Sequence, residues 1–264
     1  MERKKDKKII NNTTTGMAQT NLNQVYGEAA SQIIQGYKGI RVDKFGDEIA
    51  NHGRNLKDIS NYKVNPKYSE TNLKQQAGFS AELVEEARKN KEAILAGDKT
   101  RVRTTDGIGK TNDTQYDHIK LDKNGNIIEG SGTQMKFLKV KVDPKTGEKS
   151  YNVIDNLANQ DDWKRYDTKV VVPKEDYEGA IEYAQKQYDK NMEHYKKALD
   201  RGNVEAAKKY KKRAEDYKNT QKRIKPAKLT QEEALAARKN PEKFVAKEVQ
   251  KISIVVEWQQ LKVE

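Results

Sequence analysis

The chain has 264 residues and a formal net charge of +12, with 35% charged and only 34% hydrophobic residues. This composition supports one moderate hydrophobic core and leaves part of the chain as solvated helix or disorder. The absence of cysteine excludes disulfides, zinc–thiolate sites, iron–sulfur clusters and a cysteine nucleophile. The excess of lysine and arginine favours a polyanionic partner, although solubility alone would also account for it.

No targeting or membrane segment is evident in the sequence. The first eight residues are basic, but no apolar run follows them as it would in a secretory signal. No stretch approaches the length of a membrane span. We therefore expect a cytoplasmic protein without a membrane partner.

The first segment, residues 1–77, is polar and is expected to be mainly helical. Apolar residues recur at steps of three and four between Leu22 and Ile34, as on one face of a helix. A shorter helix is expected from Asp43 to Leu56, and Pro66 is expected to end regular structure. We expect this segment to be a helical cap or arm without chemistry of its own.

The second segment, residues 78–173, contains the strand signals. Its first helix is expected to begin at Phe79-Ser80, with Ser80 as its cap, and to stop at Gly97. The expected elements that follow are strands at Arg101–Arg103, Tyr116–Leu121 and Thr133–Val142, a pairing segment at Ser150–Ile154, a helix at Leu157–Tyr166 and a strand at Thr168–Val172. An Asn-Gly turn joins the second strand to the third. The predicted order is helix, three strands, helix, strand.

The third segment, residues 174–264, predicts a long helical hairpin and a final helix. Tyrosine and alanine recur at steps of three and four on both sides of Gly202, from Tyr177 to Ile224, with lysines outside this seam. Two antiparallel helices in a coiled coil give this pattern. The final helix is expected from Thr230 to Ile252, interrupted at Pro241. The fold class is therefore α+β, a mixed sheet flanked by helices, with N-terminal helices and a C-terminal antiparallel helical hairpin.

Three polar residues on neighbouring predicted strands form the best candidate for a catalytic site. Asp117 lies on one strand, and Gln134 and Lys136 lie two positions apart on the next, so their side chains share one face. Magnesium prefers oxygen ligands and usually binds one or two carboxylates, while a lysine can stabilise developing negative charge. Asp113 is an alternative acid in place of Asp117. His118 is expected to point to the opposite face.

With these residues and this order of elements, residues 78–173 resemble the PD-(D/E)XK nuclease superfamily. The glutamine of Gln134-Met135-Lys136 is similar to that of Mrr-like restriction endonucleases. The resemblance implies a restriction-endonuclease-like sheet, a metal held by Asp117 and Gln134, and catalysis assisted by Lys136. It also implies a supporting role for Glu82 in the first helix. The glutamine leaves one carboxylate fewer than the usual motif.

These patterns predict a nuclease that depends on Mg²⁺ or Mn²⁺ and cleaves DNA, with RNA left open. A role in defence against foreign DNA or as a toxin effector would suit such an enzyme. The alternative is a non-enzymatic nucleic-acid-binding or scaffold protein with a degenerate nuclease-like core. The helical hairpin could then bind a second copy of the chain or a protein partner.

Overall fold

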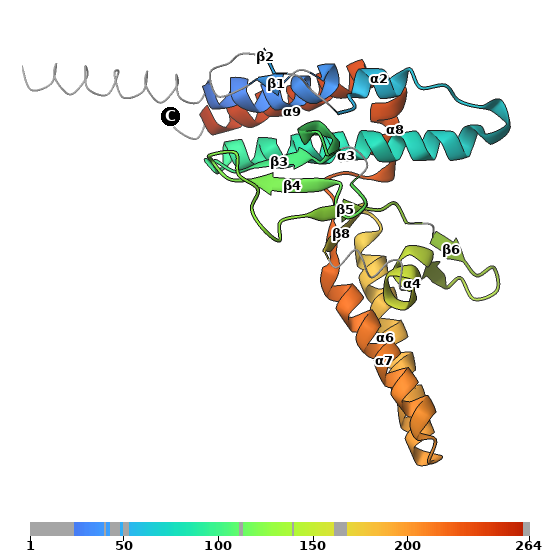
Figure 1. The fold of residues 1–264 in the computed structure, drawn as a ribbon. Coiled ribbons are helices and arrows are strands. Elements are labelled where there is room, and N and C mark those ends of the chain that lie inside the picture. The colour runs from blue at the N-terminus through green and yellow to red at the C-terminus, as the bar shows by residue number, and fades with distance from the viewer. Residues whose placement is uncertain are drawn as a thin grey trace, which may run out of the picture.

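The structure, a computed structural model, describes residues 24–39, 41–42, 48–49, 53–110, 113–138, 140–160 and 168–260. Within these ranges no helix is long and apolar enough to cross a membrane. The α+β class is confirmed, because a mixed sheet lies between helices and a helical region follows it (Figure 1).

A five-stranded sheet forms the centre of the molecule. Its strands lie in the order β3-β4-β5-β8-β9. Their bounds are Arg101–Thr104 for β3, His118–Leu121 for β4, Thr133–Met135 for β5, Lys169–Val172 for β8 and Ile224–Pro226 for β9. The first three strands are mutually antiparallel, whereas β5, β8 and β9 are parallel. The change from antiparallel to parallel pairing at β5 requires the crossover through the intervening helix.

Helices cover both faces of this sheet. On one face, Met135 and Val171 share a hydrophobic cluster with helix α3 (Ser69–Leu95) and helix α8 (Gln231–Lys239). On the other face, Val170, Val172 and Ile224 join helices α4 (Asn152–Asn159) and α6 (Tyr177–Asp200). Strand residues therefore alternate between two cores, as the period of two in a strand requires.

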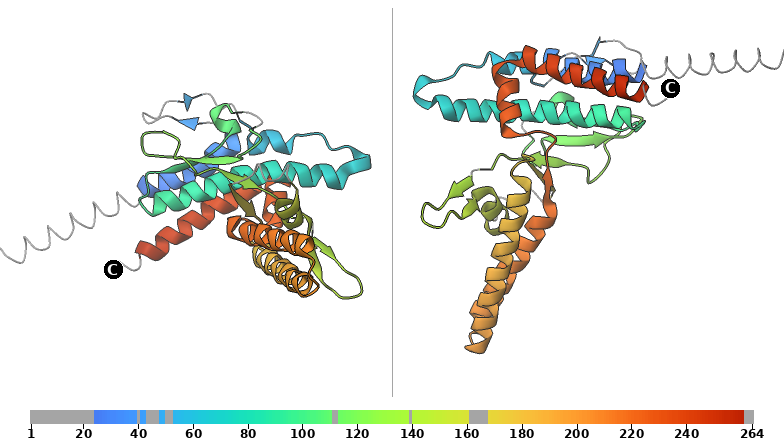
Figure 2. Two further views of the ribbon diagram at one scale, coloured as in Figure 1. Left: turned by 60° about the horizontal axis from the view of Figure 1, so that its bottom comes forward. Right: turned by 180° about the vertical axis from the view of Figure 1, so that it is seen from behind.

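The helical hairpin projects away from the sheet (Figures 1 and 2). It consists of α6 and helix α7 (Val204–Arg223), which turn at Gly202 with a positive φ of 68°. A buried alanine seam joins the two helices, with Ala184, Ala207 and Ala214 almost fully covered. The predicted antiparallel hairpin and its turn are confirmed.

Two helices follow the return of the chain to the sheet as β9. Helix α8 begins with a capping box, in which Thr230 and Glu233 exchange side-chain and backbone hydrogen bonds. Helix α9 (Pro241–Gln260) then lies beside the helix at residues 24–38 (Figure 1). Pro241 separates the two helices, as predicted.

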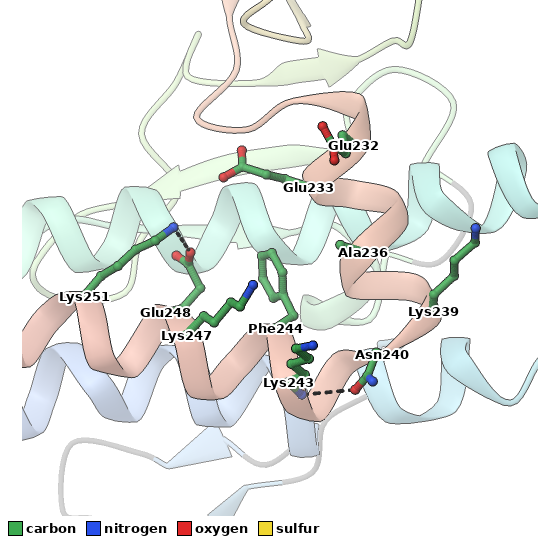
Figure 3. A pocket seen from close by; sticks show the side chains of 10 residues that line it. All are labelled: Glu232, Glu233, Ala236, Lys239, Asn240, Lys243, Phe244, Lys247, Glu248 and Lys251. Atoms are coloured by element: carbon green, nitrogen blue, oxygen red, sulfur yellow. Dashed lines mark hydrogen bonds and ion pairs between the residues drawn. The ribbon is translucent and has the colours of Figure 1, made fainter.

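Arg88 on α3 ties this C-terminal region to the rest of the protein. Its guanidinium is buried and donates hydrogen bonds to both carboxylate oxygens of Glu233 and both of Glu248, at 2.8 to 3.0 Å. Figure 3 shows these two glutamates on α8 and α9, beside Phe244. Burial alone would raise the pKa of Glu233, but Arg88 outweighs it and lowers that pKa to about 2.

The first helix of the predicted core begins eleven residues earlier than expected. Helix α3 starts at Ser69, directly after the short 3-10 helix η1 (Pro66–Tyr68). Helix α2 (Leu56–Ser60) ends before Pro66, as expected, and Pro66 is the first residue of η1. Ser80 is inside α3 and donates to the carbonyl of Gln76, so its predicted capping role is wrong. A glycine such as Gly78 costs about 1 kcal/mol within a helix, less than burial of the apolar side chains around it returns.

Other boundaries also differ from the prediction. The helix expected at Asp43–Leu56 is wrong, because residues 41–42 and 48–49 pair as strands β1 and β2 and helix α2 spans Leu56–Ser60. The strand expected at Thr133–Val142 is divided: β6 (Val140–Val142) leaves the sheet and pairs with β7 (Lys149–Tyr151). Helix α4 begins at Asn152, before its expected start, and residues 161–166 of that prediction lie outside the described residues.

Candidate functional site

The sheet register places Asp117 opposite Gln134. His118 and Thr133 are paired across the antiparallel strands β4 and β5. In an antiparallel pair, Asp117, which precedes His118, therefore lies opposite Gln134, which follows Thr133. The backbone N–H of Asp117 donates to the carbonyl of Thr133 at 2.9 Å and continues this ladder. The predicted proximity of Asp117 and Gln134 is therefore confirmed.

The Asp117 carboxylate is held by donors from β5. The side-chain amide nitrogen of Gln134 lies 2.8 Å from each carboxylate oxygen, and the backbone N–H of Met135 donates to one of them at 2.7 Å. Three donor contacts fix the orientation of the carboxylate more tightly than strand pairing alone would. Asp117 is thus a positioned acid at the start of β4.

Glu82 on α3 and Lys136 after β5 complete the group of predicted residues. Burial raises the pKa of Glu82 to about 8, the negative charge of Asp117 adds to this rise, and Lys136 opposes it. Burial also raises the pKa of Asp117, against the Met135 hydrogen bond and the charges of His118 and Lys136. All four predicted residues therefore interact, and the two carboxyl groups repel each other when both are ionised.

Two charged residues that were not predicted from the sequence act on Glu82. Asp106, on the 3-10 helix η2 (Asp106–Ile108), raises the pKa of Glu82, and Arg54 lowers it. Arg54 pairs with Asp106 at 2.8 Å, and its guanidinium lies 4.0 Å from the centre of the Phe79 ring. Arg54 belongs to the first segment, residues 1–77, which was expected to have no chemistry of its own. This segment nevertheless contributes a positive charge to the site.

A close approach of two backbones brings Arg54 to this place. A Cβ atom at Gly53 would lie 2.9 Å from the backbone nitrogen and Cα of Gly107, closer than real Cβ contacts. Glycine at position 53 is therefore required for the chain before α2 to reach η2. No local pattern in the sequence signals a contact between segments so far apart.

The alternative acid, Asp113, has a different structural setting. Its carboxylate accepts hydrogen bonds from the backbone N–H groups of Gln115 and Tyr116, at 2.8 and 3.0 Å. This is the geometry of a side chain that closes a turn. Asp117, not Asp113, is the acid that contacts Gln134.

The donor set fits a hard divalent cation. Asp117, Glu82 and the amide oxygen of Gln134 are the oxygen ligands that Mg²⁺ prefers. That amide oxygen is buried and has no hydrogen-bond partner in the described part of the chain, an arrangement that a cation would relieve. Among the described residues, no group of three or more acidic or histidine side chains is placed to hold a metal.

No protein-family model, curated protein or solved structure matches this chain. A functional interpretation therefore depends on the geometry and electrostatics of the residues themselves.

The raised pKa of Glu82 predicts a pH-dependent effect of Glu82→Gln on stability. In the folded protein the Glu82 carboxyl keeps its proton up to about pH 8. In the unfolded chain the same carboxyl releases its proton near the ordinary pKa of glutamate. Folding stability is therefore lost as the pH rises between these two values, and glutamine removes this loss. Even a third of the pKa shift of Glu82 corresponds to about 1.5 kcal/mol in the free energy of unfolding. This energy is equivalent to ~3–6 °C in Tm.

The measurement is thermal unfolding of Glu82→Gln and the native protein in EDTA at pH 4 and pH 9. We expect the variant to gain Tm at pH 9 and to match the native protein at pH 4. Glu70→Gln is the control, because Glu70 is exposed and Lys74 lowers its pKa. The same Tm difference at both pH values would contradict a protonated Glu82.

Proposed function

We propose that this chain is a metal-dependent nuclease that hydrolyses phosphodiester bonds of DNA. The observation that carries the proposal is the contact of Asp117 with Gln134 at 2.8 Å, within electrostatic reach of the buried carboxyl of Glu82 and the charge of Lys136. These groups come from three core elements, α3, β4 and β5, or from their ends.

The order of the elements supports this proposal. Helix α3 precedes strands β3, β4 and β5, and helix α4 precedes β8, which returns parallel to β5. The order helix, three strands, helix, strand is the one that the resemblance to PD-(D/E)XK nucleases implies. Glu82 is on the first helix, Asp117 at the second strand and Gln134 on the third, as in that motif.

The proposed chemistry assigns a separate role to each group. Bound Mg²⁺ or Mn²⁺ would polarise the phosphate and activate water. Asp117 and Gln134 would hold it. The Gln134 amide would have to turn, because its nitrogen now faces Asp117 and its oxygen, without a partner among the described residues, points elsewhere. Lys136 would stabilise the charge that develops on the phosphate. Glu82, whose pKa of about 8 keeps it mainly protonated near neutral pH without a metal, would lose that proton when the cation binds and would support the metal or the water.

The charge distribution supports a nucleic acid as the substrate. Helix α7 contains eight lysine and arginine residues against three acidic ones, whereas α6 is nearly balanced. Lys239, Lys243 and Lys247 add a second set of lysines along a groove of about 560 Å³ between α8 and α9 (Figure 3). Such residues bind phosphates without reading base sequence. Defence against foreign DNA or a toxin role would suit this activity.

The test of the proposal is cleavage of supercoiled plasmid by the full chain. We expect nicked and linear products with Mg²⁺ or Mn²⁺ and none in EDTA. Single-stranded DNA and RNA of equal length, run in parallel, identify the preferred substrate. Intact plasmid and intact oligonucleotides at every metal concentration would overturn the proposal.

One feature favours a second candidate, a non-enzymatic nucleic-acid-binding or scaffold protein. Gln134 and Met135 already satisfy the Asp117 carboxylate without a cation. Titration calorimetry with Mg²⁺ and Mn²⁺ separates the two candidates. Salt-sensitive DNA binding without metal binding would favour the second.

The basic face of α7 predicts a specific change in DNA affinity. Lys208, Lys209, Lys211 and Lys212 are exposed and have no carboxylate partner among the described residues. Changing all four to glutamine is expected to weaken DNA binding and to flatten its salt dependence. Each phosphate contact that is lost lowers the slope of log K against log salt by about 0.9.

Filter binding at several salt concentrations measures this slope. The matched control is Lys186→Gln with Lys197→Gln on α6, because these lysines already pair with Glu148 and Glu193. We expect the control to bind nearly as the native protein does. An unchanged slope in the α7 variant would show that this helix does not contact DNA.

A further inference from the structure

A second polar cavity lies between α3 and the sheet. It has a volume of about 510 Å³ and is lined by residues of α3 and of all five strands. Asp117 and Gln134 are not among its lining residues. The cavity is therefore a separate feature from the proposed nuclease site.

Four polar residues share the sheet face that lines this cavity. His118 pairs with Thr133, Thr133 pairs with Lys169, and Lys225 pairs with Val171, which is two residues after Lys169. Paired residues project to the same side of a sheet, and so do residues two apart on one strand. An imidazole, a hydroxyl and two ammonium groups thus converge from four adjacent strands.

Two of these groups have buried polar atoms without partners. His118 is only 1% exposed, and its Nε2 lies 2.8 Å from the main-chain carbonyl of Glu82, so Nε2 carries the hydrogen. Its Nδ1 and the Thr133 hydroxyl have no hydrogen-bond partner in the part of the chain that the structure describes. An unsatisfied buried polar group destabilises the folded protein, and a polar ligand that bonds to it would remove this cost.

The free charges at this cavity are positive. Lys169 and Lys225 are exposed and have no carboxylate partner among the described residues. Lys120 pairs with Asp98, and Glu92 at the rim pairs with Lys228 outside the lining. An anion at Lys169 and Lys225 would therefore meet two unpaired ammonium groups and little repulsion.

We propose that this cavity binds a nucleoside monophosphate. The phosphate pairs with Lys169 and Lys225, and hydroxyl or amino groups of the nucleoside reach Thr133 and His118 Nδ1. The volume is within the usual range for small-molecule sites. Inorganic phosphate can occupy only the end of the cavity that carries the two lysines. The ribose and base of a nucleoside add hydroxyl and amino groups that can hydrogen-bond to Thr133 and to His118 Nδ1.

Binding at this cavity does not depend on nuclease activity, so each proposal can fail alone. The experiment is titration calorimetry of the full chain in EDTA with AMP, adenosine and inorganic phosphate. We expect AMP to bind, and both adenosine and phosphate to bind at least tenfold more weakly. No heat with millimolar AMP, or equal affinity for AMP and phosphate, would overturn the proposal.

Two variants locate the site. Lys169→Gln with Lys225→Gln is expected to weaken AMP binding at least tenfold. Thr133→Val removes a hydroxyl that has no partner, so it should keep or raise the Tm while weakening AMP binding severalfold. Lys186→Gln with Lys197→Gln on the distant hairpin is the matched control and should bind AMP normally. AMP binding unchanged in both test variants would place the ligand elsewhere and overturn the assignment.

Discussion

Asp117→Asn is expected to abolish most metal-dependent plasmid cleavage while the protein stays folded. The change removes the negative charge of a proposed metal ligand but keeps its size and an oxygen that can accept from Met135 N–H. The Gln134 amide can turn to match the new side chain, since its oxygen has no other partner in the described structure. Loss of one preorganised electrostatic group typically costs about a hundredfold or more in rate.

Lys136→Ala should have a similar effect on cleavage and a small effect on DNA affinity. Lys136, directly after β5, carries a positive charge that acts on the carboxyl groups of both Glu82 and Asp117, whereas many other lysines remain to bind phosphate. Gln134→Glu restores a second strand carboxylate, so we expect it to keep activity or to alter the preference between Mg²⁺ and Mn²⁺. Rates of plasmid nicking by matched, folded variants measure all three changes.

Asp113→Asn is the control that separates the two acids. Asparagine can still accept from the backbone N–H groups of the turn that Asp113 closes. We expect this variant to cleave at the native rate. If the single variants Asp117→Asn and Lys136→Ala both kept full activity, the reaction would take place elsewhere on the molecule.

The sequence predicted the strands of the site because their signals are local. The Asn-Gly turn and the β-branched residues around it identify β4 and β5, and a single antiparallel pairing brings Asp117 to Gln134. The helical hairpin was equally predictable, since its alanine seam repeats at steps of three and four on both sides of Gly202. Short-range periodicity is sufficient in both cases.

The rest of the site depends on contacts that no local pattern records. Arg54 reaches Glu82 only because Gly53 packs against Gly107, which is more than fifty positions away. Strand β9 has three residues, Ile224–Pro226, too few to show a period of two, and it follows a helix without a break. Tertiary pairing with β8 converts the predicted end of that helix into a strand.

The largest change in stability is expected from Arg88→Met. Arg88 is buried and bonds Glu233, Glu248 and the carbonyl of Lys228. Methionine fills similar space but leaves Glu248, which is 2% exposed, with Lys251 as its remaining cation. Removing one member of a buried ion network costs about 3–5 kcal/mol, or ~6–20 °C in Tm at pH 7.

The pH dependence of this loss identifies its cause. Arg88 lowers the pKa of Glu233 to about 2 and that of Glu248 below its ordinary range, against the effect of burial. The stability from the network is therefore fully present above the ordinary pKa of glutamate and is lost as the pH falls toward 2. The Tm difference between native protein and Arg88→Met should shrink from pH 7 to pH 3.

A compensated variant tests whether the cost comes from uncompensated charge. Adding Glu233→Gln and Glu248→Leu to Arg88→Met removes both orphaned carboxylates, and glutamine can still serve the capping box at Thr230. Because apolar replacements of buried ion networks are often neutral, we expect this triple variant to recover most of the lost Tm. Lys74→Met, at the fully exposed pair with Glu70, should leave the Tm nearly unchanged. If the triple variant is no more stable than Arg88→Met, packing around Arg88, and not its charge, joins α3 to the C-terminal helices.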